Sequence, residues 1–387
     1  MPIKNRFAEL LPEITEWRRD FHRNPELLFD THRTAGIVAE KLGVFGCDEV
    51  VTGIGRTGVV GVIKGKTDTT GNVIGLRADM DALPILEETG VDYASTTPGK
   101  MHACGHDGHT AMLLGAAKYL SETRNFDGTV VVIFQPAEEG GGGGREMVED
   151  GMMERFNIKE VYGMHNWPKL PVGQFAIRPG PFFAATDQFE LIVEGRGGHA
   201  AKPNEVIDTT LIASHIVVAL QSIVSRNIHP DSNLVVSVTS FETSSKAFNV
   251  IPQTVHIKGT IRSMGEEMRA LGETRMREIS AGVAATYGGT VEVIFHPGYP
   301  ATVNSPEQTE FAADVARAVS GDCLDAEITM GGEDFSYMLE KRPGAYILVG
   351  NGDTADVHHP KYNFSDETIP AGCSYWAEIV ERRMPAA

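Results

Sequence analysis

The chain has 387 residues, of which 42% are hydrophobic and 22% are charged. This composition is typical of a globular protein, and the length exceeds the roughly 250 to 300 residues at which a single core stops growing, so we expect two domains. The 34 Lys and Arg residues are outnumbered by 52 Asp and Glu, giving a net charge of −18 with neutral histidine, which argues against a phosphate-binding surface and a nucleic-acid partner.

Two features of the sequence indicate the cellular compartment: segment 1–20 and the placing of the cysteines. Charged residues interrupt the apolar residues of this segment, unlike the core of a signal peptide, and no apolar run looks long enough to span a bilayer. The cysteines are scattered without a CxxC pair or a dense framework, at Cys47, Cys104, Cys323 and Cys373. We therefore predict a cytoplasmic protein with no membrane partner.

The first half of the chain alternates short apolar strands with helices. An amphipathic helix opens it, with apolar residues at helical spacing from Leu10 to Phe21 and a stop at Asn24-Pro25. The elements expected next are strands at 59–63 and 73–77, a helix at 110–121, a strand at 130–134, a helix at 146–156 and a strand at 161–164. Such alternation predicts the α/β class, with a mostly parallel sheet flanked by helices on both faces.

The pattern changes after residue 180. The elements expected there are a strand at 189–194, a helix at 208–225, strands at 234–241 and 255–262, a helix at 266–287 and a strand at 290–295. This β-α-β-β-α-β order is the ferredoxin-like arrangement. The first pattern returns with a helix at 306–320, a strand at 346–349 and a helix from 371. We predict a discontinuous large domain of residues 1–184 and 299–387, with a small domain inserted at 185–298.

A run at residues 101–110, MHACGHDGHT, has the composition of a metal site. It places the Cys104 thiol two residues before the His106 imidazole, and borderline-soft ions such as zinc accept sulfur, imidazole and carboxylate ligands together. Candidates for the remaining ligands follow other predicted strands or lie near the C-terminus, at Glu138, Glu139, His165, His358 and His359. Two adjacent glutamates can divide the work, because one can bind metal while its neighbour moves a proton.

Short strings spread over the whole chain match one family in collinear order. They are RRDFH at 18–22, RADMDALP at 77–84, the run at 101–110, FQPAEEG at 134–140, GMHN at 163–166, GGHA at 197–200, NVIP at 249–252, GTIR at 259–262 and EDF at 333–335. Together they make the sequence resemble the aminoacylase, hippurate hydrolase and indole-acetyl-amino-acid hydrolase family of dinuclear-metal amidohydrolases. The resemblance implies cleavage of N-acyl amino acids, carrying an N-acetyl, benzoyl or similar group, to a carboxylic acid and a free amino acid.

The resemblance also implies two divalent ions per subunit, zinc or manganese, or cobalt or nickel in their place. The ligands it implies are Cys104, in a bridging role, with His106, Glu139, His165 and His358. His358 is preferred over His359 because the family pattern puts the ligand two residues before the proline. Glu138 becomes the general base, and the large domain becomes the metal-binding catalytic domain.

Other residues are expected around these ligands. Asp81 would orient ligands through hydrogen bonds, and His109 would orient the start of the helix rather than bind metal. Asp79 stands where members of the wider family have a metal-binding histidine, and it stays open between orienting a ligand and contacting substrate. The EDF string at 333–335 stays open between a turn with a helix cap and a place beside the substrate.

The inserted domain is expected to serve as a lid and dimerisation domain. The resemblance makes His199 a group that stabilises the oxyanion, from its own or a neighbouring subunit, and makes Asn249 and Arg262 substrate-binding residues, since a guanidinium fork suits a carboxylate. The strand at 189–194 has one well-defined apolar face, formed by Phe189, Leu191 and Val193, and we expect it to be an exposed edge that pairs with its copy. A homodimer or higher homo-oligomer follows.

Two other functions compete with this one. A dipeptidase built on the same metals is the nearest enzyme alternative. A metal-binding scaffold without catalysis is the second, but such a protein has no need of the base Glu138 beside its ligands.

Overall fold

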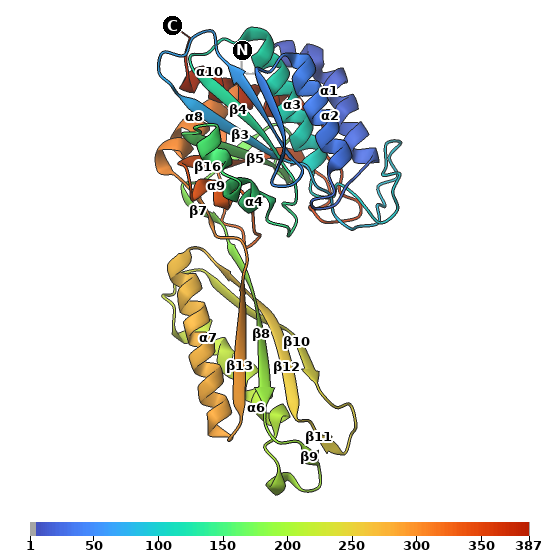
Figure 1. The fold of residues 1–387 in the computed structure, drawn as a ribbon, viewed down its shortest axis with the longest axis vertical. Helices are drawn as coiled ribbons and strands as arrows, with labels where there is room; N and C mark the ends of the chain where they lie inside the picture. The colour runs from blue at the N-terminus through green and yellow to red at the C-terminus, as the bar shows by residue number, and fades with distance from the viewer. Residues whose placement is uncertain (1–4, 387) are drawn as a thin grey trace. The chain divides into compact units, whose positions relative to one another are not determined.

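A sheet of eight strands forms the centre of the larger part of the chain (Figure 1). The computed structural model describes residues 5–386, so the first four residues of segment 1–20 lie outside the described part. The strands lie in the order β1-β2-β4-β3-β5-β16-β6-β15. Their bounds are β1 Glu49–Ile54, β2 Gly58–Lys64, β3 Val73–Asp79, β4 Thr129–Gln135, β5 Glu160–Pro168, β6 Phe175–Ile177, β15 Cys323–Asp325 and β16 Gly344–Gly352.

The middle of this sheet is parallel. β3 pairs in parallel with both β4 and β5, and β5 pairs in parallel with β16, whereas β1 and β2 extend one edge in antiparallel fashion. All of β3 is buried, and so is β4 apart from Thr129. Continuous buried apolar runs are typical of parallel strands that are covered on both faces. The predicted α/β class with a mostly parallel sheet is confirmed.

Helices cover both faces of this sheet. Leu42 of α2 lies over Gly61 of β2, whereas Met147 of α4 lies against Gly58 of the same strand. Residues an odd number apart in a strand point to opposite faces, so α2 and α4 lie on opposite sides. The helices of this part are α1 Asn5–Arg23, α2 His32–Phe45, α3 His106–Thr123, α4 Gly143–Glu149, α5 Met152–Arg155, α8 Pro306–Ser320, α9 Ser336–Leu339 and α10 Ile369–Arg383.

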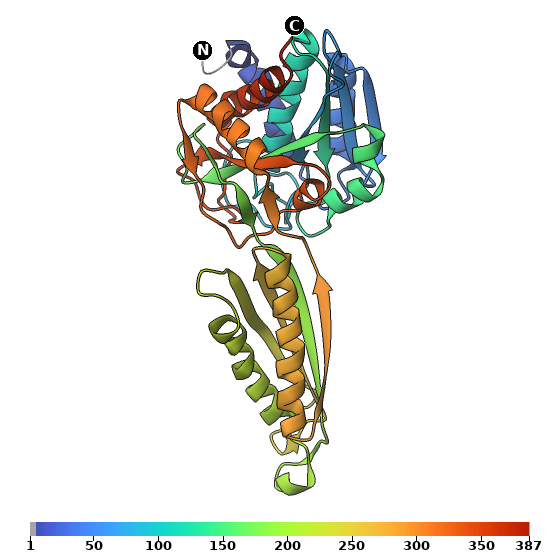
Figure 2. The same cartoon turned by 90° about the vertical axis from the view of Figure 1, so that its left-hand side faces the viewer.

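The chain divides into two compact units. The small unit comprises Pro181–Thr302 and Ile328–Glu333, and the large unit comprises the rest. The small unit holds an antiparallel sheet of order β10-β12-β8-β13, and α6 and α7 pack together on one of its faces (Figure 2). The bounds are β8 Ala185–Glu194, α6 Thr209–Arg226, β10 Leu234–Thr243, β12 Thr254–Ser263, α7 Glu266–Thr286 and β13 Thr290–Pro297. Short pairs add to these: β9 Gly198–His199 with β11 Val250–Ile251, and β7 Gly180–Phe183 with β14 Thr302–Asn304.

The strand predicted at 189–194 is not an edge strand. β8 lies between β12 and β13 and pairs with both, so the edges of this sheet are β10 and β13. Its alternation is as expected, because Phe189, Leu191 and Val193 are buried in the core of the small unit. Alternation shows that one face of a strand is covered, but it does not show which strands lie beside it. The prediction that this strand pairs with its own copy is therefore wrong.

α6 is the one helix within residues 5–386 that is long and apolar enough to cross a membrane, although the sequence suggested no such run. Its residues Ile212, Ile216, Leu220 and Ile223 are fully buried in the core of the small unit. We interpret its composition as that of a core helix.

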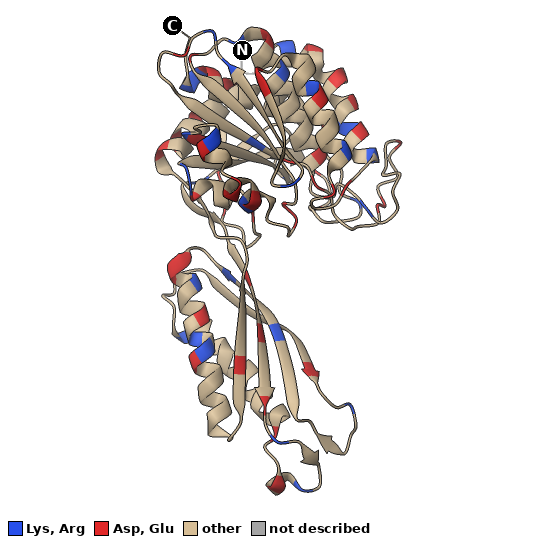
Figure 3. Cartoon of the chain, in the orientation of Figure 1, with Lys and Arg blue, Asp and Glu red and all other residues tan. Residues whose placement is uncertain are grey.

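Charged residues of both signs are interspersed along α1, α2 and α7 (Figure 3). Several pair along or between helices, as Arg6 does with Glu122 of α3 and Arg277 does with Glu273. The excess of acidic residues is thus not concentrated on these helices, and part of it lies buried at the carboxyl ends of the central strands.

Candidate metal centre

The predicted ligands converge at the carboxyl ends of neighbouring strands of the large unit. Asp79 is the last residue of β3, and Glu138 and Glu139 lie in the turn that follows β4. His165 lies within β5, which pairs beside β3, rather than after the end of the strand. This edge of an open α/β sheet is where ligands generally bind.

Gly105 shapes the turn that presents Cys104 and His106, the first residue of α3. Gly105 has a φ of 89°, in the left-handed region. A Cβ at this position would lie 2.3 Å from the side-chain nitrogen of Asn166. Only glycine tolerates both the backbone conformation and the close approach. The turn can therefore bring Cys104 against the end of β5, where His165 and Asn166 lie.

Among the described residues, five groups of three side chains have ligand atoms close enough to hold a metal ion, and two of these groups contain Cys104. In each group the atoms lie within 4.8 Å of one another. One group is Cys104, His106 and His165, and the Cys104 Sγ lies 3.3 Å from His165 Nε2. The other is Cys104, Glu139 and His358, and His358 Nε2 lies 3.2 Å from Glu139 Oε1. Cys104 belongs to both groups.

His106 has no hydrogen-bond partner among residues 5–386, although it is fully buried. Its nearest acidic atoms are Asp81 Oδ1, 3.6 Å from Nδ1, and Asp79 Oδ2, 3.8 Å from Nε2. Buried polar atoms are nearly always paired, so an unpaired imidazole here needs an explanation. A metal ion bound to His106 would satisfy one of its nitrogens.

The charges around these ligands favour a cation. Burial by itself would lower the pKa of His106, but the carboxylates of Asp79, Asp81 and Glu139 raise it to about 10. Burial, together with Glu139 and other carboxylates, raises the pKa of the Cys104 thiol well above its usual value. Positive charge is therefore stabilised here, and a thiolate is not stable here without it. The types of donor atom and the negative electrostatic potential around them both fit divalent ions.

The orientation of His165 is fixed by its own strand. Its Nδ1 lies 2.6 Å from the carbonyl oxygen of Asn166 and donates to it, which leaves the Nε2 lone pair directed at Cys104. Burial, together with the neighbouring His109, holds the pKa of His165 well below its usual value. A neutral imidazole with a fixed tautomer is the form that binds metal.

Asp81 holds the turn that carries the two glutamates. Its Oδ1 accepts the backbone N–H of Glu138 at 2.9 Å, and its Oδ2 accepts that of Glu139 at 3.1 Å. Ala137, just before them, has a φ of 54°, which is uncommon for a residue other than glycine. The two hydrogen bonds offset the cost of that backbone conformation and hold the turn in place.

Asp79 and His109 contact each other, and Asp334 lies within a neighbouring network. His109 does more than orient the start of α3, because its ring lies between Asp79 of β3 and Asn166 of β5. Asp334 accepts hydrogen bonds from Arg77 and the Gln135 side chain and is fully buried, which supports a structural place for the EDF string. No role for Asn166 could be predicted from the sequence, although it follows His165 in a matching string.

The three predicted residues of the inserted domain lie in the small unit. His199 is in β9, which pairs with β11, and the carbonyl oxygen of Asn249 accepts the backbone N–H of Ala200 at 3.0 Å. His199 and Asn249 are thus neighbours at one end of this unit. Arg262 lies apart from them in β12.

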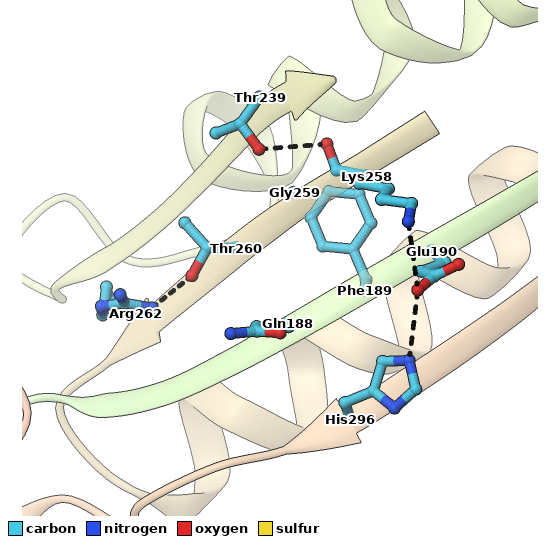
Figure 4. A pocket seen from close by; sticks show the side chains of 9 residues that line it. All are labelled: Gln188, Phe189, Glu190, Thr239, Lys258, Gly259, Thr260, Arg262 and His296. Atoms are coloured by element: carbon cyan, nitrogen blue, oxygen red, sulfur yellow. Dashed lines mark hydrogen bonds and ion pairs between the residues drawn. The ribbon is translucent and has the colours of Figure 1, made fainter. Parts of the chain in front are cut away.

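Arg262 lines a pocket of about 260 Å³ on the open face of the small sheet (Figure 4). Thr260, Gln188 and Glu190 line it as well, and Lys258 Nζ lies 3.7 Å from Glu190 Oε1. Arg262 Nη1 donates to Thr260 Oγ1 (Figure 4) and to the carbonyl oxygen of Ile261. No ion pair within residues 5–386 engages Arg262, so its other guanidinium nitrogens can face an anionic group.

Thiol, imidazole and carboxylate side chains lie together at the strand ends of a mostly parallel, helix-covered sheet, and side chains of these types suit a metal-dependent hydrolase. The chain belongs to peptidase family M20/M25/M40, whose family model matches residues 75–382. The predicted family is confirmed, and the chain is a hydrolase that acts on amide bonds.

Similar proteins agree with this assignment over nearly the whole chain. A hippurate hydrolase of Campylobacter jejuni is 41% identical over 381 residues, which cover 96% of this chain and 98% of that protein. An N-acetylcysteine deacetylase of Bacillus subtilis is 39% identical, with 95% of each chain covered. The crystal structure of a dinuclear metal binding peptidase of the M20 family from Bacillus subtilis is 34% identical, covers 98% of this chain and 100% of that one, and has a TM-score of 0.87.

Proposed function

We propose that the chain is a metal-dependent amidohydrolase that cleaves N-acyl amino acids to a carboxylic acid and a free amino acid. The observation that carries the proposal is the place of Cys104 in both ligand groups, with Glu138 close by. The similar proteins named hippurate hydrolase and N-acetylcysteine deacetylase support an acylated amino acid as the substrate.

Two divalent ions per subunit fit these residues. Cys104, His106 and His165 would hold one ion. Glu139 and His358 would hold the other together with the same thiolate, which then bridges the pair. This donor mixture suits zinc, and manganese, cobalt or nickel can take its place. Such ions supply Lewis acidity toward the amide carbonyl and the attacking water.

Glu138 is the general base in this proposal. Its carboxylate lies within 4.8 Å of ligand atoms of His106 and Glu139, and its residue is only 7% exposed. A carboxylate in this place takes the proton of the attacking water and returns it to the leaving nitrogen, so that the amine departs neutral. Asp81 serves the same step indirectly, because it holds the backbone of both glutamates.

The small unit supplies the groups that hold the substrate. Arg262 forms no ion pair within residues 5–386, and its planar fork suits the free carboxylate of an N-acyl amino acid. Asn249 would also bind the substrate, and His199 would donate to the oxyanion that develops on the carbonyl oxygen. These last two assignments rest on the family resemblance and on the neighbouring positions of His199 and Asn249.

We also propose a cytoplasmic homodimer or higher homo-oligomer in which residues 185–298 form the lid and dimerisation domain. A thiolate ligand is best protected from oxidation in a reducing compartment. The exposed edges of the small sheet are β10 and β13, so either one, rather than β8, could pair with a second copy.

A substrate panel tests the proposal. Protein stripped with a chelator and reloaded with Zn²⁺, Mn²⁺, Co²⁺ or Ni²⁺ should hydrolyse N-acetyl, benzoyl or indole-acetyl amino acids with a higher kcat/KM than dipeptides. The reverse preference would make the chain a dipeptidase. Metal binding without hydrolysis of either N-acyl amino acids or dipeptides would indicate a metal-binding scaffold without catalysis.

A further inference from the structure

A buried chain of hydrogen bonds runs from β3 to β5 beside the proposed metal centre. Arg77 Nη1 donates to Asp79 Oδ2 at 2.7 Å, and Asp79 Oδ1 lies 2.6 Å from His109 Nδ1. The backbone N–H of Asn166 donates to His109 Nε2 at 2.9 Å. None of these four residues is more than 2% exposed. All four lie outside the proposed ligand set.

These contacts fix which nitrogen of His109 carries the proton. A backbone N–H can only donate, so His109 Nε2 must accept from Asn166. The carboxylate of Asp79, paired with Arg77 on its other oxygen, can only accept, so His109 Nδ1 must donate to it. His109 therefore has no free lone pair with which to bind a metal ion.

This result decides between two uses of the same residues. The ligand atoms of Asp79, His106 and His109 lie within 4.8 Å of one another, which is close enough to hold an ion. Both oxygens of Asp79 and both nitrogens of His109 already have partners, however, whereas both nitrogens of His106 have none among residues 5–386. Only His106 of these three has an open ligand atom.

Asn166 connects the chain of hydrogen bonds to the ligands. Its carbonyl oxygen accepts from His165 Nδ1, and its side-chain nitrogen donates to the carbonyl oxygen of Cys104 at 2.6 Å. The Tyr362 hydroxyl donates to the side-chain oxygen of Asn166 at 2.5 Å. A shift of Asn166 would therefore turn the His165 ring and move the backbone that carries the Cys104 thiol.

We propose that Asp79 and His109 are positioning residues of the metal centre. Asp79 sets the tautomer of His109, His109 fixes Asn166, and Asn166 directs His165 Nε2 and Cys104 Sγ toward a shared ion. The inference rests on the proposed function, because it takes His165 and Cys104 as ligands. It also gives Asp79 a role other than that of the metal-binding histidine found there in the wider family.

Two substitutions separate the two ends of the His109 ring. His109→Asn keeps a donor near the place of Nδ1 but loses the acceptor for Asn166, whereas His109→Gln keeps an acceptor near the place of Nε2 but loses the donor to Asp79. We expect His109→Asn to weaken Co²⁺ binding by about 10- to 100-fold, as loss of ligand-orienting partners typically does. We expect His109→Gln to stay within a few-fold of the wild type.

Chelator competition gives the affinity, and the thiolate-to-cobalt absorption band reports the geometry at Cys104. The band should shift in His109→Asn and remain in place in His109→Gln. The number of bound ions should be unchanged in both variants. Loss of one ion from both variants would make His109 a ligand and overturn the proposal. An equal fall in Tm in both variants, with Co²⁺ affinity and the absorption band unchanged, would mean that His109 serves only to pack the core. That result would overturn the proposal too.

A measurement on the unaltered chain is independent of how the variants fold. ¹⁵N NMR of the metal-free, histidine-labelled protein should show His109 protonated at Nδ1 and bare at Nε2, and the opposite tautomer would contradict the proposal. Failure of the proposed function looks different. In that case the wild-type chain would bind no Co²⁺ at Cys104, whatever the tautomer of His109.

Discussion

Glu138 and Glu139 are adjacent, yet they are proposed to do different work. Glu138→Gln removes the proton carrier and keeps the size of the side chain, so metal content should stay the same while kcat falls by about 10²-fold or more. Glu139→Gln is the matched control, because it removes a ligand and should release metal. Elemental analysis and steady-state kinetics measure both effects. Near-normal kcat in Glu138→Gln would contradict the assignment.

Metal affinity should rise with pH, because two ligands must lose protons to bind. Burial and Glu139 raise the pKa of the metal-free Cys104 thiol, and the pKa of His106 is about 10 because nearby carboxylates outweigh burial. The affinity for Zn²⁺ should therefore increase steadily from about pH 6 to pH 9, since binding displaces these protons. Cys104→Ser should show a shallower increase. Affinity that is independent of pH would count against both ligands.

The individual site residues could be predicted because each lies in a short matching string of the sequence. The contacts between them could not. His109 of α3 contacts both Asp79 of β3 and Asn166 of β5 because these two strands are neighbours, and His109 and Asn166 are 57 positions apart in the chain. A single sequence does not show which strands are neighbours, so Asn166 received no role.

At the scale of elements, a buried charge cluster joins α1 to α3. His22 Nδ1 lies 2.8 Å from Asp107 Oδ2, and its Nε2 lies 3.2 Å from Glu87 Oε1. Burial lowers the pKa of His22, but Asp107 and Glu87 outweigh it and raise the pKa to about 9. The unfolded value is about 6.5. Protonated His22 therefore stabilises the fold fully below about pH 6.5, and this contribution is lost as the pH rises through about 9.

His22→Gln tests this link between the two helices. The difference in free energy of unfolding between the wild type and the variant should be largest near pH 6 and should shrink toward pH 10, for the reason just given. His229→Gln, at a side chain that is 73% exposed, is the control and should change stability little at any pH. Denaturant unfolding at several pH values, followed by a signal from the large unit, measures the stability of both variants. A constant difference for His22→Gln would exclude the predicted linkage.

Long, periodic elements were predicted well, and short or irregular ones were not. The helix expected at 146–156 is two helices, α4 and α5, because Gly151 adopts a φ of 79° between them. β6 and β15 have three residues each, too few to show a period. α2 includes two glycines, Gly36 and Gly43, which weaken its helical pattern.

At the scale of the whole molecule, the order of elements was predictable but their pairing was not. The β-α-β-β-α-β order of the small unit could be read from the sequence, whereas the central place of β8 depends on hydrogen bonds to β12 and β13, which lie far along the chain. A prediction of oligomer contacts from one strand therefore failed. The oligomer itself remains a proposal.

His199 tests whether the small unit takes part in catalysis. His199→Ala should lower kcat by about 10²- to 10³-fold, the range for loss of one oxyanion donor, with metal content unchanged. His229→Ala, an exposed histidine of the same unit, should have no such effect. Lost stability with kcat preserved in the folded fraction would indicate a structural role instead.

Mixed subunits then show where His199 acts. If it acts across subunits, refolding His199→Ala together with Glu138→Gln should restore activity, because each heterodimer would contain one intact composite site. No recovery, once heterodimers are shown to form, would mean that His199 acts within its own subunit.

The central claim is that one thiolate, that of Cys104, is shared by two metal ions. Anomalous diffraction at the zinc absorption edge, from crystals of zinc-loaded protein, tests it most directly. We predict two anomalous peaks per chain, each about 2.3 Å from Cys104 Sγ, the usual zinc–sulfur distance. One peak would lie beside His106 and His165, and the other beside Glu139 and His358. A single peak, or peaks of which neither lies at bonding distance from Cys104, would contradict the account.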